Sequence, residues 1–183
     1  MPDTSTFKWS YILETNDTQL KIDTAWNTYN SISHWISAAD TKAELSLGTI
    51  GVIGTIILTS LVDTPPSEIL SNRFQLILLI LGCCTSILSV YFCFRCLNPK
   101  LSVGEPTSSI YFSHIAKQFS SAKRYHSQVS ESWDDQQILE ELAHQIWANS
   151  HIAQRKYVSV AWALRFLSAT VFLSILGILS TLV

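Results

Sequence analysis

Residues 22–62 read IDTAWNTYNSISHWISAADTKAELSLGTIGVIGTIILTSLV, and this stretch decides the fold. In residues 22–43, apolar side chains recur at alternating steps of three and four, the spacing of an amphipathic helix. The apolar run Leu45–Val62 follows; its 18 residues span roughly 27 Å as a helix, close to a hydrocarbon core of about 30 Å. Because neither Gly nor Pro separates the two halves, the sequence predicts one helix that continues into a membrane span.

The amphipathic half carries a packing seam, which we define as Ile22, Ala25, Tyr29, Ile32, Ile36, Ala39 and Ala43. This seam is suited either to association with a second copy of the chain or to docking on the chain's own later helices. Its length of about three heptads is the minimum for a coiled coil, so the spacing does not decide between self-association and docking within the chain. Asn16 or Asp17 is expected to cap the helix, because a short side-chain oxygen accepts from first-turn N–H groups.

Composition and charge are typical of a membrane protein. Of 183 residues, 48% are hydrophobic and only 14% are charged, with a formal net charge of −2. The chain therefore has no general electrostatic attraction to nucleic acid. The first 17 residues lack the basic flank, short apolar core and cleavage site of a secretory signal peptide, so the polar parts are expected to face the cytoplasm.

Two further apolar runs predict a second and a third span. Residues 63–73, with the helix-breaking pair Pro65-Pro66, form an external loop before a span at 74–94. Residues 95–157 form cytoplasmic helices, one from Thr107 or Ser108 to about Ser130 and one opened by Ser132. The latter continues through residues 158–183, the membrane entry and third span.

The expected fold class is therefore all-α. It has three transmembrane helices extended into a cytoplasmic helical bundle, to which residues 1–44 contribute an N-terminal region and helix. Lys and Arg number three in residues 1–44, one in 63–73 and seven in 95–157. The positive-inside rule then places the N-terminus in the cytoplasm and the C-terminus outside.

Each predicted span presents small residues on one face. Such faces allow helix backbones to approach closely in a packed bundle or oligomer, and they could equally line a narrow pore. The three faces consist of Gly48, Gly51, Thr55 and Thr59; Gly82, Ser86, Ser89 and Cys93; and Thr170, Ser174, Gly177 and Thr181.

The sequence contains none of the common catalytic motifs, and an enzymatic function is not expected. The pair Cys93-x-x-Cys96 has no second pair to complete a zinc site, which favours packing over metal binding. Cations and aromatic residues do gather next to the predicted spans, either as positive-inside anchors or as a site for an anion with a flat ring. They are Lys42, Arg95, Lys100, Tyr111, Phe112, Arg124, Trp147, Arg155 and Lys156.

Five short motifs occur in a characteristic order around the spans. They are Ala39-Asp40-Thr41-Lys42-Ala43, the two-span hairpin, Asn98-Pro99-Lys100-Leu101, Ile110-Tyr111-Phe112 and Arg155-Lys156-Tyr157. Their order and spacing resemble the transmembrane effector family of Pycsar antiphage systems, from about residue 35 to the end of the chain.

The resemblance implies a bacterial inner-membrane effector that responds to cyclic CMP or cyclic UMP made by a partner cyclase. Activated effectors of this kind disrupt the membrane and cause abortive infection. By position in the matching motifs, the functional residues would be Asp40, Lys42, Asn98, Lys100, Tyr111, Phe112, Arg155 and Lys156, with Arg124 added from the cationic set. A homo-oligomer is expected, with no other cofactor. The alternatives are a membrane effector triggered by another nucleotide or by a protein partner, and a constitutive oligomeric scaffold.

Overall fold

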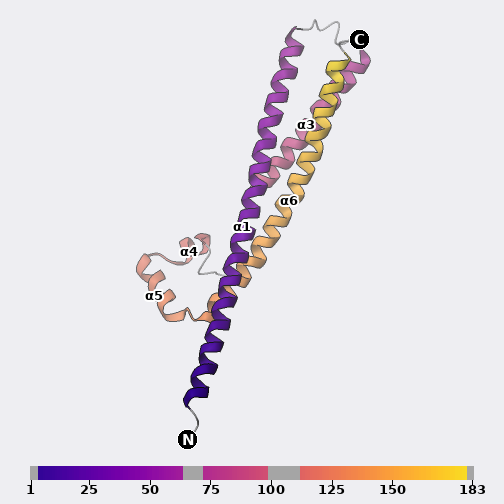
Figure 1. Ribbon diagram of the computed structural model, residues 1–183. Coiled ribbons are helices and arrows are strands. Elements are labelled where there is room, and N and C mark those ends of the chain that lie inside the picture. The colour runs from indigo at the N-terminus through magenta and orange to yellow at the C-terminus, as the bar shows by residue number, and fades with distance from the viewer. Residues whose placement is uncertain (1–3, 64–71, 99–111, 181–183) are drawn as a thin grey trace. The chain divides into compact units, whose positions relative to one another are not determined.

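The computed structural model describes residues 4–63, 72–98 and 112–180, and these residues are helical apart from short connections (Figure 1). The helices are α1 (Thr4–Asp63), α3 (Arg73–Leu97), α4 (Phe112–Gln118), α5 (Ala122–Ser132) and α6 (Asp135–Leu179). Helices α1, α3 and α6 are long and apolar enough to cross a membrane. The expected all-α fold with three apolar spans is therefore confirmed.

The chain forms two compact units. We call residues 1–35 and 100–152 the polar unit, and residues 36–99 and 153–183 the membrane unit. Helices α1 and α6 each contribute residues to both units, because neither helix is interrupted at the boundary.

Helix α1 begins earlier in the chain than Asn16 and Asp17, the two residues expected to cap it. It starts at Thr4, so Asn16 and Asp17 lie inside the helix and do not cap it. No Pro occurs between Thr4 and Asp63 to stop the helix from extending in either direction. Inside the helix, Asp17 instead accepts from Lys21 at 2.5 Å, an exposed pair at the i,i+4 spacing.

The middle of the chain also departs from prediction, because the single helix expected to reach Ser130 is broken into α4 and α5. Ser121 caps the second piece by accepting from the backbone N–H of Arg124. Ser132 is the last residue of α5 and does not open α6; Asp134 does so by accepting from the N–H of Gln137 at 2.7 Å. Thr107 and Ser108 lie outside the described residues.

Each residue of the packing seam is buried or partly buried within the single chain. In the polar unit, Ile22 and Ile32 of α1 are each only 6% exposed, and Leu142 of α6 is fully buried. In the membrane unit, Ala39 and Ala43 are fully buried as well. Docking on the chain's own helices, the second of the two expected uses, is therefore what the seam does in this structure.

The core of the membrane unit is a close crossing of three helices. It consists of Ala39 and Ala43 from α1, Cys93 and Cys96 from α3, and Val160 and Ala163 from α6. Small side chains at these positions bring the backbones near enough for Ser89 of α3 to donate to the carbonyl of Ala163 at 2.8 Å. We call this crossing the three-helix junction.

Two of the three expected small-residue faces pack against each other. Thr170 of α6 donates to the Thr85 hydroxyl at 2.9 Å, and Ser86 donates to Thr170 at 3.4 Å. The face on α1 differs, because Gly48, Gly51, Thr55 and Thr59 are exposed along the single chain. Thr181, the last residue predicted on the α6 face, lies outside the described residues.

Candidate functional site at the three-helix junction

Asp40 brings all three apolar helices together at one carboxylate. Lys156 of α6 donates to Asp40 Oδ1 at 2.5 Å, although 116 residues separate the two in sequence. The Cys96 Sγ of α3 lies 3.8 Å from the same oxygen and 3.9 Å from the carbonyl of Ala39. A single acceptor therefore connects α1, α3 and α6.

The Asp40–Lys156 ion pair is partly shielded from water. The Lys156 side chain is 14% exposed and the Asp40 side chain is 31% exposed. By contrast, both side chains of the Lys21–Asp17 pair are more than half exposed. Because water and salt screen a shielded pair less, the Asp40–Lys156 pair is the stronger link, and removing one partner leaves a charge that is poorly solvated.

A second contact between α1 and α6 lies next to the ion pair. The ammonium group of Lys42 sits 5.2 Å from the ring centroid of Tyr157, which follows Lys156 directly. Such a cation–π contact is worth about 0.5–1 kcal/mol at an exposed site. Two cations, one carboxylate and one phenol ring are thus held together where the apolar run of α1 begins.

Further into the span, aromatic rings continue the contact between α3 and α6. The Phe92 ring stacks on Phe166 with centroids 5.7 Å apart and on Trp162 at 6.2 Å. The guanidinium of Arg165 lies 4.8 Å from the Trp162 ring centroid. This arrangement keeps the Arg165 charge against an aromatic face.

The structure brings three of the nine predicted site residues together, namely Asp40, Lys42 and Lys156. Arg155 precedes Lys156 on α6 and is exposed. Asn98 caps the end of α3, where its backbone N–H donates to the carbonyl of Phe94.

The remaining predicted residues belong elsewhere. Arg124 lies in the first turn of α5 in the polar unit. Lys100 and Tyr111 lie outside the described residues, as does the side chain of Phe112, whose backbone begins α4.

Sequence reasoning missed Tyr157 and Cys96 as members of the site. Tyr157 belongs to the Arg155-Lys156-Tyr157 motif but is not among the predicted site residues, although its place directly after Lys156 was a usable signal. Cys96 was assigned to packing, and the structure does bury it, but beside the Asp40 carboxylate. Among the described residues, no group of three His, Cys, Asp or Glu side chains is placed to hold a metal ion.

The junction has the chemistry to respond to an anion that carries a flat ring. A phosphate can compete with Asp40 for a lysine ammonium group, because both are anionic oxygen acceptors. A planar ring can likewise compete with Lys42 for the face of Tyr157. Either exchange would weaken the contacts that tie α1 to α6.

Residues 24–183 match the Pycsar effector protein domain, PycTM. This range includes the whole three-helix junction and the apolar parts of α1, α3 and α6. Neither a curated protein nor a solved structure matches the chain significantly.

Proposed function

This chain belongs to the Pycsar transmembrane effector family, and from that premise we propose that it is an antiphage effector of the bacterial inner membrane. A cyclic pyrimidine mononucleotide, cyclic CMP or cyclic UMP, made by a partner cyclase during infection, activates it. The activated protein, assembled as a homo-oligomer, disrupts the membrane and stops the infected cell. The observation that carries this proposal beyond the family is the Asp40–Lys156 pair, which joins two spans at their polar ends.

In the proposed topology, the N-terminus and residues 95–157 face the cytoplasm and the C-terminus faces outside. The distribution of Lys and Arg supports this orientation. It places the junction at the cytoplasmic boundary of the membrane, where a nucleotide made in the cytoplasm can reach Lys42 and Arg155.

The Asp40–Lys156 pair acts as a latch that holds the resting state. The nucleotide phosphate binds Lys42 and Arg155. This binding rearranges the contacts between α1 and α6 at the junction. No Pro interrupts α1 or α6, so a shift of either helix in the polar unit is carried into the apolar run of the same helix. The ligand favours the open state only to the extent that it binds that state more tightly.

Dye release from vesicles tests this function directly. Purified full-length protein is reconstituted in phosphatidylethanolamine–phosphatidylglycerol vesicles loaded with a self-quenched dye. We expect release on addition of cyclic CMP or cyclic UMP and none with cyclic AMP, because the base must be read as well as the phosphate. No release with any of the three, from protein shown to be inserted and helical, would contradict nucleotide gating.

The same assay separates the proposed function from its alternatives. Release without any nucleotide would favour a constitutive membrane-active protein. If none of the three nucleotides causes dye release but a lysate of infected cells does, after the cyclic nucleotides in the lysate have been hydrolysed, the result would favour a protein trigger. Vesicles that stay intact under every condition would favour a scaffold.

Lys42→Ala and Arg155→Ala test the assignment of the ligand site. Each variant removes a cation outside the apolar core, so insertion and helix content should stay unchanged. Loss of a charge-assisted contact of about 1.5–3 kcal/mol should raise the half-maximal nucleotide concentration roughly 10- to 150-fold. Lys123→Ala, which removes an exposed cation of α5, is the matched control. An unchanged nucleotide response in both site variants would exclude this site.

A further inference from the structure

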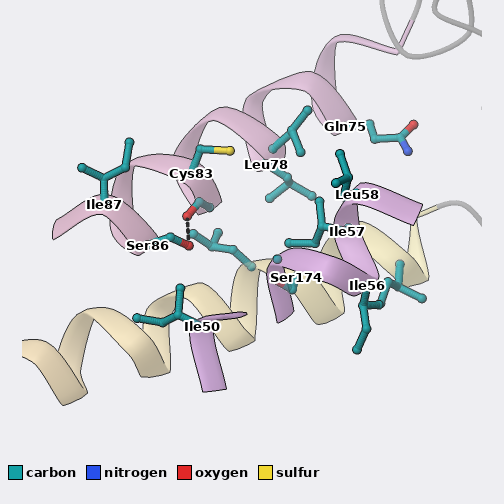
Figure 2. A pocket seen from close by; sticks show the side chains of 16 residues that line it. Ile50, Ile56, Ile57, Leu58, Gln75, Leu78, Cys83, Ser86, Ile87 and Ser174 are labelled. Atoms are coloured by element: carbon teal, nitrogen blue, oxygen red, sulfur yellow. Dashed lines mark hydrogen bonds between the residues drawn. The ribbon is translucent and has the colours of Figure 1, made fainter. Parts of the chain in front are cut away.

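A cavity of about 540 Å³ lies in the membrane unit between α1, α3 and α6 (Figure 2). Its walls include Ile50 and Ile57 of α1, Leu78 and Leu79 of α3, and Leu173 and Ile178 of α6. None of the residues that form the core of the three-helix junction lines it. It is thus a feature separate from the site at Asp40.

The cavity presents hydrocarbon almost throughout. Its two hydroxyl groups already donate within their own helices, Ser86 to the carbonyl of Gly82 and Ser174 to that of Thr170, both at 2.8 Å. Gln75, at the end of the cavity next to Leu58, carries the only amide side chain among the lining residues (Figure 2). The lining of the cavity therefore matches an amphiphilic molecule, because it is apolar along its length and polar at one end.

The length of the cavity corresponds to one leaflet of a bilayer. Along α3 it extends from Gln75 to Ile87, which is about 18 Å at 1.5 Å per residue. Half of a hydrocarbon core of about 30 Å is roughly 15 Å. Gln75 lies in the first turn of α3, on the side of the 63–73 loop, and the exposed Arg73 at the start of the helix offers a cation for a lipid phosphate.

We propose that this cavity binds one acyl chain of a membrane lipid, with the lipid's polar end at Gln75 and Arg73. The cavity is open to the surroundings of the helices, because Ile56, Leu58 and Ile178 of its lining are each at least half exposed, and hydrocarbon is the solvent that surrounds a membrane span. Gly54 of α1 and Gly177 of α6 line the cavity without a side chain, and a Cβ atom built on either meets no atom within 4 Å. The bound chain separates α1 from α3 and α6 in this leaflet.

Photocrosslinking tests the proposal on the full-length protein without any nucleotide, so its result does not depend on the proposed gating. The protein is reconstituted in phosphatidylethanolamine–phosphatidylglycerol vesicles that contain a phosphatidylethanolamine with a diazirine in its acyl chain. Crosslinked positions are then mapped by mass spectrometry. We expect labelling of Leu79 and Leu173 in the cavity to exceed, several-fold, that of the lipid-facing Ile80 and Phe172.

A glycine pair on α1 supplies the matched variants. Gly54→Leu places a side chain into the cavity, whereas Gly51→Leu, one turn earlier, adds the same side chain outside the lining residues. Labelling of Leu79 and Leu173 should fall several-fold in the first variant and persist in the second. Equal labelling of cavity and lipid-facing residues in the unmodified protein, or labelling of Leu79 and Leu173 that persists in the Gly54→Leu variant, would overturn the proposal.

Discussion

Vesicles that contain the Lys156→Asp variant are expected to release dye without any nucleotide. This substitution removes the ammonium group that lies 2.5 Å from Asp40 Oδ1 and adds a second carboxylate on the facing helix, in a partly shielded position. Loss of the pair and the new repulsion should together cost the resting state about 2 kcal/mol or more, which shifts a two-state equilibrium roughly thirtyfold. The measurement is the spontaneous rate of dye release at equal protein content.

The reciprocal double variant, Asp40→Lys with Lys156→Asp, distinguishes a latch from general damage. It restores opposite charges across the same two helices, so spontaneous release should fall back and the nucleotide response should return at least in part. Lys21→Asp is the matched control, because it reverses a lysine in an exposed pair within α1. Spontaneous release that is equal in the single and double variants would rule out the latch.

Replacement of Ala163 by Leu is expected to have the largest effect on the stability of the membrane unit. Ala163 is fully buried at the junction, and its carbonyl accepts from Ser89 at 2.8 Å. Three extra carbon atoms at this crossing must push α3 and α6 apart, and overpacking of this kind typically costs about 1–3 kcal/mol. The free energy of unfolding is measured by titration from mild detergent into dodecyl sulfate, with far-UV circular dichroism as the probe of helix content.

Ala161→Leu is the control for this experiment, because Ala161 lies on the same helix but is exposed. It adds the same atoms with the same helix propensity, so it should leave the unfolding midpoint nearly unchanged. If Ala161→Leu and Ala163→Leu shift the midpoint equally, close packing at the junction does not hold the helices together.

The apolar helices themselves were predictable from sequence. A backbone in hydrocarbon must satisfy its own hydrogen bonds, so a single apolar run of about 20 residues is expected to form a helix. The absence of Pro likewise predicted that α1 and α6 would continue from polar sequence into apolar sequence. The helix ends in polar sequence were less predictable, because Asp17, Ser121 and Asp134 compete with many similar residues for the role of cap.

The candidate site was predictable only in part. The motifs around Asp40 and Lys156 correctly identified the turns of α1 and α6 that contribute to the site. Neither motif predicted that these two side chains form an ion pair. Tyr157 and Cys96 joined the site for the same reason, since their contacts depend on partners in other helices.

Sequence alone thus determined that the three apolar segments are helical and long enough to span a membrane, and which turns next to them carry the charges, because these properties arise within one stretch of chain. Tertiary structure decided that the seam is buried in the chain, that Asp40 pairs with Lys156, and that a cavity remains between the helices. Those outcomes depend on the rotation and crossing of helices far apart in sequence, which local periodicity does not specify.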